Sequence, residues 1–326
     1  MIVITGAGGM IGSVIAWHFN SIENFTDLIL CDDLKQDDQE KNYAKRKFLK
    51  FVHKDQLFDF LEIEKKNITG IFHMGAISAT TEKIFSNLIK DNIRYSQQLW
   101  IFCSKNKIPL VFASSAATYG NGKDGYSDID DEANFNPLNA YGYSKYFFDQ
   151  WVSSQQKLKV SPPYWYSCKF FNVYGPNEYH KGRMASVVYH AYNQYKNETE
   201  VRLFKSDNPE YKDGMQLRDF IYVKDAVKAI IYLFKNKAKS GIYNIGTGKA
   251  QSFKALAEAL IKNANGTNEQ IKYIEMPDDL KGKYQYFTEA TIEKLRRAGY
   301  DETFYNLDAG VTDYYQNYLS KKDQYL

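Results

Sequence analysis

The chain opens with Met1-Ile2-Val3-Ile4-Thr5-Gly6-Ala7-Gly8-Gly9-Met10-Ile11-Gly12-Ser13, and this segment carries a strong structural signal. Its first four residues form the short continuous apolar run that is typical of a buried parallel strand. Gly6, Gly9 and Gly12 follow in GxxGxxG spacing, and a helical pattern comes after them. Glycine at the first two positions lets the backbone approach a pyrophosphate, and the third lets the helix pack against the strand. A glycine-rich loop alone is equally consistent with an ordinary turn, but the flanking strand and helix favour a dinucleotide-binding unit.

Further apolar runs predict the other strands of a parallel sheet. They lie at residues 28–31, 70–73, 109–113 and 241–246. We expect the run at 70–73 to be the third strand. Helical patterns occupy residues 57–65, 85–105, 225–235, 252–260 and 307–318. We therefore expect an α/β protein with a Rossmann-type doubly wound parallel sheet and a smaller mixed α/β substrate-binding domain. The dinucleotide-binding domain would comprise residues 1–170 plus about 219–247, and the sugar-nucleotide domain residues 171–218 plus about 248–326.

Composition excludes several classes of protein. The 326 residues are 44% hydrophobic and carry 42 basic and 39 acidic side chains, so the chain is neither disordered nor a basic nucleic-acid binder. Cys31, Cys103 and Cys168 lie far apart in apolar runs, as reduced core cysteines of a cytoplasmic protein do. No signal stretch, membrane-length run or metal-ligand spacing is present, so we expect no membrane partner and no metal.

Two acidic residues, Asp32 and Asp33, end the second apolar run, twenty residues beyond Gly12. An acid at this place would hold the adenosine ribose hydroxyls of a dinucleotide. A carboxylate also disfavours a 2′-phosphate, because like charges repel. Nearby basic residues could neutralise such a phosphate, so the residues leave NAD and NADP open: Lys35, Lys41, Lys45, Arg46 and Lys47.

The segment Tyr141-Gly142-Tyr143-Ser144-Lys145 places a tyrosine and a lysine four residues apart, on one face of a helix. An ammonium beside a phenol favours the phenolate and lowers its pKa, so the tyrosine could exchange protons near neutral pH. Solvated helix faces often match this pattern, which alone is weak. Hydroxyl residues Ser114 and Ser115 follow the strand at 109–113, at the ligand-binding edge of the sheet, although strand-end caps are the plain alternative.

The combination of TGAGGMIGS, ASSAATYG and YGYSK resembles the extended short-chain dehydrogenase/reductase superfamily of nucleotide-sugar epimerases and dehydratases. Later segments, FNVYGPNEYHKGRMAS, YNIGTGKAQSF and LKGKYQYFTEA, resemble its ADP-heptose 6-epimerase family, and the likeness runs nearly end to end. The resemblance implies conversion of ADP-D-glycero-D-manno-heptose to its L-glycero epimer at C6 through a 6-keto intermediate, supplying lipopolysaccharide inner-core heptose. It also implies tightly bound NADP (or NAD), one per subunit, and a homo-oligomer, specifically a pentamer.

The resemblance also assigns roles to individual residues. Ser115 would hydrogen-bond the reacting hydroxyl, Tyr141 would be an acid/base, Lys145 would lower its pKa and hold the nicotinamide ribose, and Lys181 would be a second acid/base. Cofactor contacts would be Gly6, Gly9, Met10, Ile11, Gly12, Asp32, Asp33, Lys54, Met74, Gly75, Ala76, Ile77, Ser78, Asn92, Lys145, Val173 and Lys181. Substrate contacts would be Asn172, Arg183, His190, Phe204, Lys205, Ser206, Asp207, Arg218 and Tyr284.

Inversion of a carbinol carbon in one site favours two acid/base groups on opposite faces, which is the physical reason for wanting both Tyr141 and Lys181. Lys181 would then need a pKa lowered by burial and by the cationic nicotinamide; alternatively, it binds a phosphate. Arg218 is a forked donor suited to a diphosphate, although it could instead pair with Asp219 or Asp225.

Some positions depart from the family pattern. Gln39 aligns where the family commonly carries a lysine near the 2′-phosphate, Asp33 stands where asparagine is frequent, and Arg183 replaces a small polar residue. An insertion at residues 208–216 precedes Arg218. One competing function is that of another nucleotide-sugar enzyme, either a UDP-hexose 4-epimerase or a dehydratase. A dehydratase would need an Asp-Glu pair near Thr118. The other competing function is that of a non-catalytic dinucleotide-sensing regulator.

Overall fold

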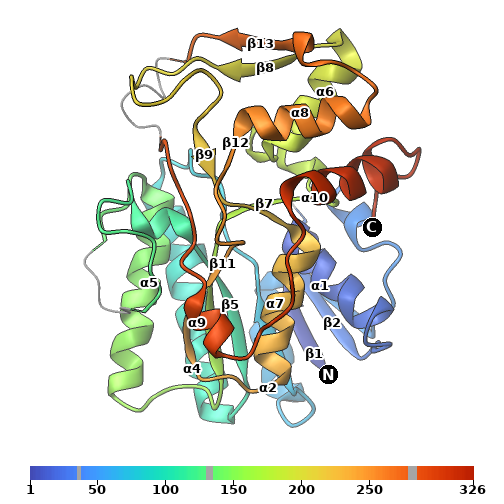
Figure 1. Cartoon of the computed structure of the whole chain (residues 1–326). Coiled ribbons are helices and arrows are strands. Elements are labelled where there is room, and N and C mark those ends of the chain that lie inside the picture. The colour runs from blue at the N-terminus through green and yellow to red at the C-terminus, as the bar shows by residue number, and fades with distance from the viewer. Residues whose placement is uncertain (35–37, 130–134, 278–284) are drawn as a thin grey trace.

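A seven-stranded parallel sheet forms the base of the molecule (Figure 1) in this computed structural model, which describes residues 1–34, 38–129, 135–277 and 285–326. The strand order is β11-β6-β5-β4-β1-β2-β3. The strands are β1 (Ile2–Thr5), β2 (Leu28–Asp32), β3 (Lys50–His53), β4 (Gly70–His73), β5 (Leu110–Ser115), β6 (Trp165–Phe170) and β11 (Gly241–Ile245). The predicted α/β doubly wound sheet is confirmed, and the late strand β11 joins it as expected, beside β6.

Strand β3 was not predicted, so Gly70–His73 is the fourth strand in chain order rather than the third. β3 is an edge strand that pairs only with β2 in this sheet. Of its four residues only Val52 is buried, so it has no continuous apolar run that would indicate a strand.

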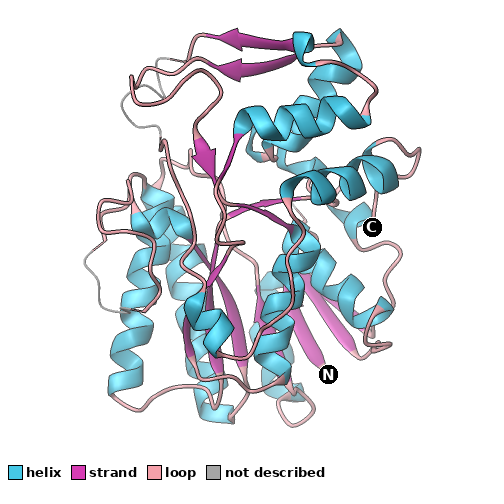
Figure 2. Ribbon diagram, viewed as in Figure 1, coloured by secondary structure: helices cyan, strands magenta, loops and turns pink. Residues whose placement is uncertain are grey.

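Helices cover both faces of the sheet (Figure 2). Because side chains alternate along a strand, Ile2 and Ile4 pack with α1 (Met10–Ser21) and α7 (Val223–Lys235). Val3 packs instead with the helices of the opposite face, which are α2 (Leu57–Glu64), α4 (Tyr95–Asn106) and α5 (Ala140–Lys157). The predicted helix at 85–105 is present as α3 (Phe85–Leu88), a π-helical segment (Ile89–Arg94) and α4.

A smaller α/β unit lies over the carboxyl ends of the sheet strands (Figure 1). In it, β8 (Val201–Phe204) pairs in parallel with β13 (Ile271–Ile274). Its helices are α6 (Val187–Glu198), α8 (Phe253–Asn263) and α10 (Leu307–Tyr314), which continues as a π-helical segment (Tyr315–Leu319). The predicted helix starting near Ser252 is confirmed, and the Ser252 hydroxyl caps it by accepting from the Ala255 N–H.

Two short strand pairs lie between the sheet and this smaller unit. They are β7 (Asn172–Tyr174) with β10 (Phe220–Tyr222), and β9 (Leu217–Arg218) with β12 (Gln251–Ser252). The remaining short elements are η1 (Gln39–Asn42), η2 (Lys54–Gln56), η4 (Ala116–Tyr119), η5 (Tyr179–Met184), η6 (Asn268–Gln270) and α9 (Glu293–Arg297). The chain passes repeatedly between the two units, and the domain limits given above stay a prediction.

The three cysteines are buried and unpaired, as expected. No helix within the described ranges has both the length and the apolarity that a membrane crossing requires.

Candidate active site

A cavity of about 360 Å³ opens at the carboxyl ends of β1 and β4, where the strand order reverses. Ligands bind doubly wound sheets at this switch point. Fourteen of the predicted cofactor residues line it: Gly6, Gly9, Met10, Ile11, Gly12, Asp32, Asp33, Lys54, Met74, Gly75, Ala76, Ile77, Ser78 and Lys181. The structure therefore brings the glycine loop, the acidic strand end and the candidate second acid/base into one wall.

The glycine loop requires glycine for two different reasons. Gly6 has φ +67°, in the left-handed region, and a Cβ there would lie 2.6 Å from the Gly75 backbone nitrogen. At Gly12 a Cβ would lie 2.1 Å from the Gly6 carbonyl oxygen. The loop and helix α1 thus pack too closely for a side chain, which fits a cradle for a pyrophosphate.

Replacing Gly12 with alanine is expected to destabilise the protein by about 1–3 kcal/mol, because the new methyl group must displace backbone rather than a flexible side chain. Thermal unfolding followed by circular dichroism should show a lower Tm and a weaker response to added dinucleotide. Ser21→Ala, at the exposed end of the same helix, is the matched control. An unchanged Tm in Gly12→Ala would contradict the packing described here.

The acidic end of β2 is built into the cavity wall. One Asp32 oxygen accepts from the Gly8 N–H at 2.8 Å, which ties this carboxylate to the glycine loop. Asp33 lies 3.0 Å from the Lys54 ammonium, which also pairs with Asp91 at 3.3 Å. Burial raises the pKa of Asp32, and backbone hydrogen bonds from Asp33, Gly8 and Leu34 offset part of that rise. The cavity lining here thus carries three carboxylates, Asp32, Asp33 and Asp91, and the Lys54 ammonium.

The basic cluster only partly fits its predicted role. Lys41 pairs with Asp38, Lys45 pairs with Asp323 at 2.7 Å, and Arg46 donates to the Leu326 carbonyl at 3.1 Å. Two of these cations thus hold the C-terminal segment. Gln39 lines the cavity, and Lys35 lies outside the described residues.

Asn92 was predicted to contact the cofactor, and its buried amide makes other contacts. It accepts from the Ile77 N–H at 2.8 Å and donates to the Ile77 carbonyl at 3.0 Å. It also donates to the Ser144 hydroxyl at 3.0 Å. Asn92 therefore fastens the loop after β4, which lines the cavity, to helix α5.

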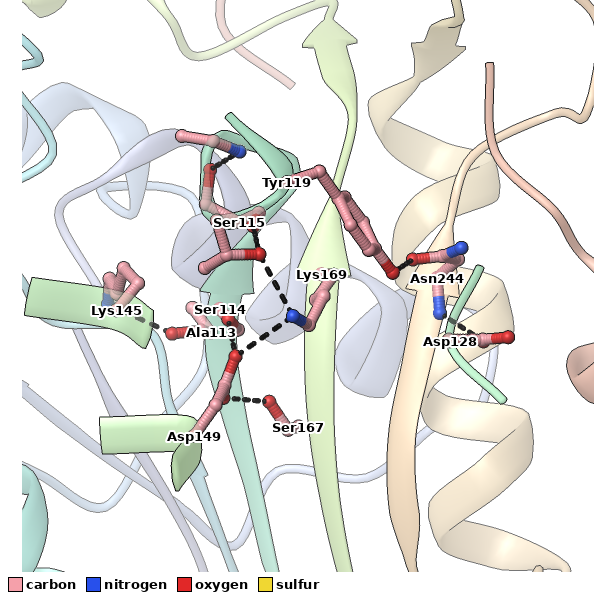
Figure 3. Close-up of polar contacts among 12 residues, drawn as sticks. Ala113, Ser114, Ser115, Tyr119, Asp128, Lys145, Asp149, Ser167, Lys169 and Asn244 are labelled. Carbon is pink, nitrogen blue, oxygen red and sulfur yellow. Dashed lines mark hydrogen bonds and ion pairs between the residues drawn. The ribbon is translucent and has the colours of Figure 1, made fainter. Parts of the chain in front are cut away.

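The serine, tyrosine and lysine of the candidate catalytic group come from two elements. Ser115 ends β5, while Tyr141 and Lys145 lie in the first turns of α5, which Asn139 caps by accepting from the Gly142 N–H at 2.8 Å. Tyr141 and Lys145 are 9% and 5% exposed, and the Lys145 ammonium donates to the Ala113 carbonyl at 2.9 Å (Figure 3).

Of Tyr141 and Lys145, the tyrosine shows a pKa shift opposite in direction to the one expected. Burial raises the pKa of Tyr141, and a hydrogen bond with Ser115 offsets part of the rise. Burial lowers the pKa of Lys145 to about 8. The expected lowering of the Tyr141 pKa is therefore not seen here, because desolvation of the phenolate outweighs the stabilising contacts.

Lys181 lies in η5, next to Gly182, whose φ is +51°. Its ammonium lies 3.8 Å from the Met10 sulfur, at the glycine loop. Burial lowers the pKa of Lys181, against an opposing effect of Glu178, so the predicted direction is confirmed. Glu178 is itself buried and accepts from the Ser186 N–H and hydroxyl, which fixes the segment that carries the lysine.

The predicted substrate stretch, Phe204 to Asp207, begins at the last residue of β8 and is held by the insertion at 208–216. The Ser206 N–H donates to Asp213 at 2.8 Å, and the Gly214 N–H donates to the Phe204 carbonyl. Lys205 is exposed and pairs with Glu275 at 2.7 Å. The insertion therefore folds back on this stretch.

The other predicted substrate residues are dispersed. Arg218 is buried and donates to the carbonyls of Leu217 and Gln285, with its guanidinium 5.6 Å from the Phe253 ring. Its neighbour Asp219 instead accepts from the N–H groups of Thr247, Gly248 and Ala290. Asn172 and Arg183 are exposed, and His190 contacts the Arg183 carbonyl. Val173, predicted as a cofactor contact, lies in β7 and is not among the residues that line the cavity. Tyr284 lies outside the described residues.

Sequence reasoning missed Asp91, Tyr95 and His180 as cavity residues and Asn42 as their support. The Asn42 amide donates to the Gly8 carbonyl at 2.7 Å and lies 3.2 Å from His180 Nδ1. The sequence around Asn42 has no periodic pattern, so no local feature indicated a role for this residue. His180 could have been noticed, because it adjoins Lys181.

Comparisons with known proteins show the family of the chain. A model of the NAD dependent epimerase/dehydratase family matches residues 2–246. A relative named ADP-L-glycero-D-manno-heptose-6-epimerase, from Fusobacterium nucleatum, is 49% identical over 100% of both chains, and one from Nitratidesulfovibrio vulgaris is 43% identical over the same share. The crystal structure of the Helicobacter pylori ADP-L-glycero-D-manno-heptose-6-epimerase has a TM-score of 0.82 and 29% identity, covering 97% of this chain and 95% of that one. The chain therefore belongs to the NAD dependent epimerase/dehydratase family and, within it, to the ADP-L-glycero-D-manno-heptose-6-epimerases.

Proposed function

We propose that the protein converts ADP-D-glycero-D-manno-heptose to ADP-L-glycero-D-manno-heptose by inversion at C6, as the names of its relatives suggest. The observation that carries the proposal is the position of Lys181, which lies in the same cavity wall as the glycine loop. A half-buried lysine with a lowered pKa at a dinucleotide site is suited to proton transfer.

The chain's own residues would move the protons. The residues that line the cavity would hold a nicotinamide dinucleotide, which would supply reversible hydride transfer at C6. Tyr141, with Ser115 beside it, would transfer the proton of the C6 hydroxyl on one face. Lys145 would favour the phenolate by its charge, and Lys181 would serve as the acid/base for the opposite face. The proposal requires one acid/base group on each face of the sugar carbon.

The test uses the purified protein and ADP-D-glycero-D-manno-heptose, with the configuration at C6 followed by proton NMR. We expect conversion to an equilibrium mixture of both epimers. UDP-glucose is the comparison substrate, and its conversion to UDP-galactose with no change in the heptose would favour a hexose 4-epimerase. Tight dinucleotide binding without conversion of either sugar would indicate a sensing role.

The identity of the dinucleotide is a separate question. NADP follows from the family resemblance, and the excess of Asp32, Asp33 and Asp91 over Lys54 in the cavity wall favours NAD. Denaturing the purified protein and measuring the released cofactor by mass spectrometry distinguishes them. Release of NADP would mean that cations other than Lys54 neutralise the 2′-phosphate. Release of NAD would agree with the excess of carboxylates in the cavity wall.

The expected homo-oligomer, specifically a pentamer, and the cytoplasmic location also remain predictions. Sedimentation equilibrium of the full chain tests the first of them.

A further inference from the structure

A buried ion pair lies beneath the candidate catalytic residues. Asp149 follows Tyr141 and Lys145 at the same four-residue spacing, so all three lie on one face of α5. Asp149 is 1% exposed and Lys169, in β6, is 2% exposed, with 3.4 Å between the ammonium and Oδ2 of the carboxylate. The pair is shown with its partners in Figure 3.

Both members of the pair form hydrogen bonds with hydroxyl groups of β5, η4 and β6. The Asp149 carboxylate accepts from the Ser114 hydroxyl at 2.6 Å and from the Ser167 hydroxyl at 2.7 Å. The Lys169 ammonium donates to the Thr118 hydroxyl at 2.9 Å, and that hydroxyl donates to the Ser115 carbonyl at 2.8 Å. The pair is thus linked to Ser115 through Thr118 and to the tyrosine and lysine through their shared helix.

Burial of such a pair is costly, and apolar residues would stabilise the fold as well or better. The Asp149 carboxylate of this pair acts electrostatically on Lys145 and Tyr141. The Asp149 carboxylate raises the pKa of Lys145, against the larger effect of burial, and it also raises the pKa of Tyr141. The Lys169 ammonium is an opposite charge 3.4 Å from Oδ2 of this buried carboxylate, so we expect it to offset part of the field that the carboxylate exerts on Lys145 and Tyr141.

Two buried titratable groups near the pair, His73 and Cys168, stay uncharged near neutral pH. Burial, and then Lys145, lower the pKa of His73 to about 3, so this imidazole is neutral. Burial raises the pKa of Cys168, which stays a thiol. The titratable groups around the pair in the described residues are Tyr141, Lys145, Cys168, Tyr119 and Asp128, and His73 lies near Lys145.

We propose that Asp149 and Lys169 are positioning residues of the reaction, with opposite effects: Asp149 keeps Lys145 in its ammonium form, and Lys169 limits the action of that carboxylate on Lys145 and Tyr141. The inference rests on the proposed roles of Tyr141 and Lys145. It assigns neither Asp149 nor Lys169 a contact with substrate.

The test compares Asp149→Asn with Lys169→Met. Loss of the carboxylate removes the charge that favours the Lys145 ammonium, so the titration of Lys145 should move to lower pH by about one unit. Loss of Lys169 leaves the carboxylate unopposed, so the titration should move to higher pH by a similar amount. The alkaline limb of the kcat profile should follow in both variants, with KM for the nucleotide sugar changing less than about threefold.

The titration is measured directly by NMR of full-length protein labelled at lysine ¹³Cε, with the Lys145 signal assigned by its loss in Lys145→Arg. This measurement does not depend on turnover, so an inactive wild-type protein would overturn the proposed function while leaving this result readable. Lys169→Arg keeps the charge and should restore the wild-type titration. Asp313→Asn and Lys224→Met are the controls, because they break another partly buried ion pair, with 2.9 Å between its members. They should leave the Lys145 titration unchanged.

Shifts in opposite directions support the proposal. A Lys145 titration that stays in place in both variants, or moves in the same direction in both, overturns it. If Asp149→Asn does not fold, Lys169→Met must still move the titration upward, and the double variant Asp149→Asn/Lys169→Met must return it toward the wild-type position.

Discussion

Replacing Tyr141 with phenylalanine is expected to lower kcat for C6 inversion by about 10²–10⁴-fold, the usual contribution of a positioned acid/base. The substitution removes one oxygen from a side chain that is 9% exposed, so the helix should keep its packing. Because the phenol acts in the transition state rather than in binding, KM for the nucleotide sugar should change less than about threefold. Initial rates measured by NMR on the wild type and the variant give both constants.

The matched control is Tyr143→Phe, on the same helix. The Tyr143 hydroxyl donates to the Asn136 side chain at 2.6 Å, away from Ser115, so its loss should leave kcat within about twofold of the wild type. Near-wild-type inversion by Tyr141→Phe would reject the phenol as an acid/base. Equal losses in both variants would point to damage of the helix instead.

Replacing Lys181 with methionine should lower kcat by a similar factor of about 10²–10⁴, because inversion needs a proton transfer on each face of the sugar carbon. Lys181→Arg separates the two roles left open for this residue. An arginine keeps the positive charge but does not release its proton at neutral pH. We therefore expect Lys181→Arg to be nearly as inactive as Lys181→Met.

Recovery of activity in Lys181→Arg, with a raised KM in Lys181→Met, would show that the lysine binds a phosphate rather than exchanging a proton. Lys66→Met is the control for loss of a lysine, since Lys66 is exposed and lies before β4, at the edge of the sheet opposite the cavity. Near-wild-type kcat in both Lys181 variants would remove Lys181 from the mechanism.

Much of the fold followed from local patterns. The apolar runs at β1, β2, β4, β5 and β11 are visible because a parallel strand covered on both faces is apolar throughout. The edge strand β3 escaped notice because its exposed Lys50 and His53 interrupt that pattern. Likewise, the sequence did not indicate that Lys45 and Arg46, which it left open as partners of a 2′-phosphate, contact Asp323 and Leu326, which are distant in sequence.

The site was predictable to the extent that the family resemblance identified its residues. The cavity does gather Asp32, Lys54 and Lys181, three residues far apart in sequence. The pKa of Tyr141 is raised where a lowering was expected, because burial depends on the elements that cover a side chain and not on its neighbours in the chain. The cofactor contact of Asn92 stays a prediction, and its amide also fastens the loop at Ile77.

The sequence by itself determined the parallel sheet, the glycine loop and the spacing that places Tyr141, Lys145 and Asp149 on one helix face, since these depend on backbone periodicity. Only the tertiary structure decided that Lys169 meets Asp149 beneath that face. The physical reason is that charge interactions depend on distance and on exclusion of water, and both are set when separate elements pack together.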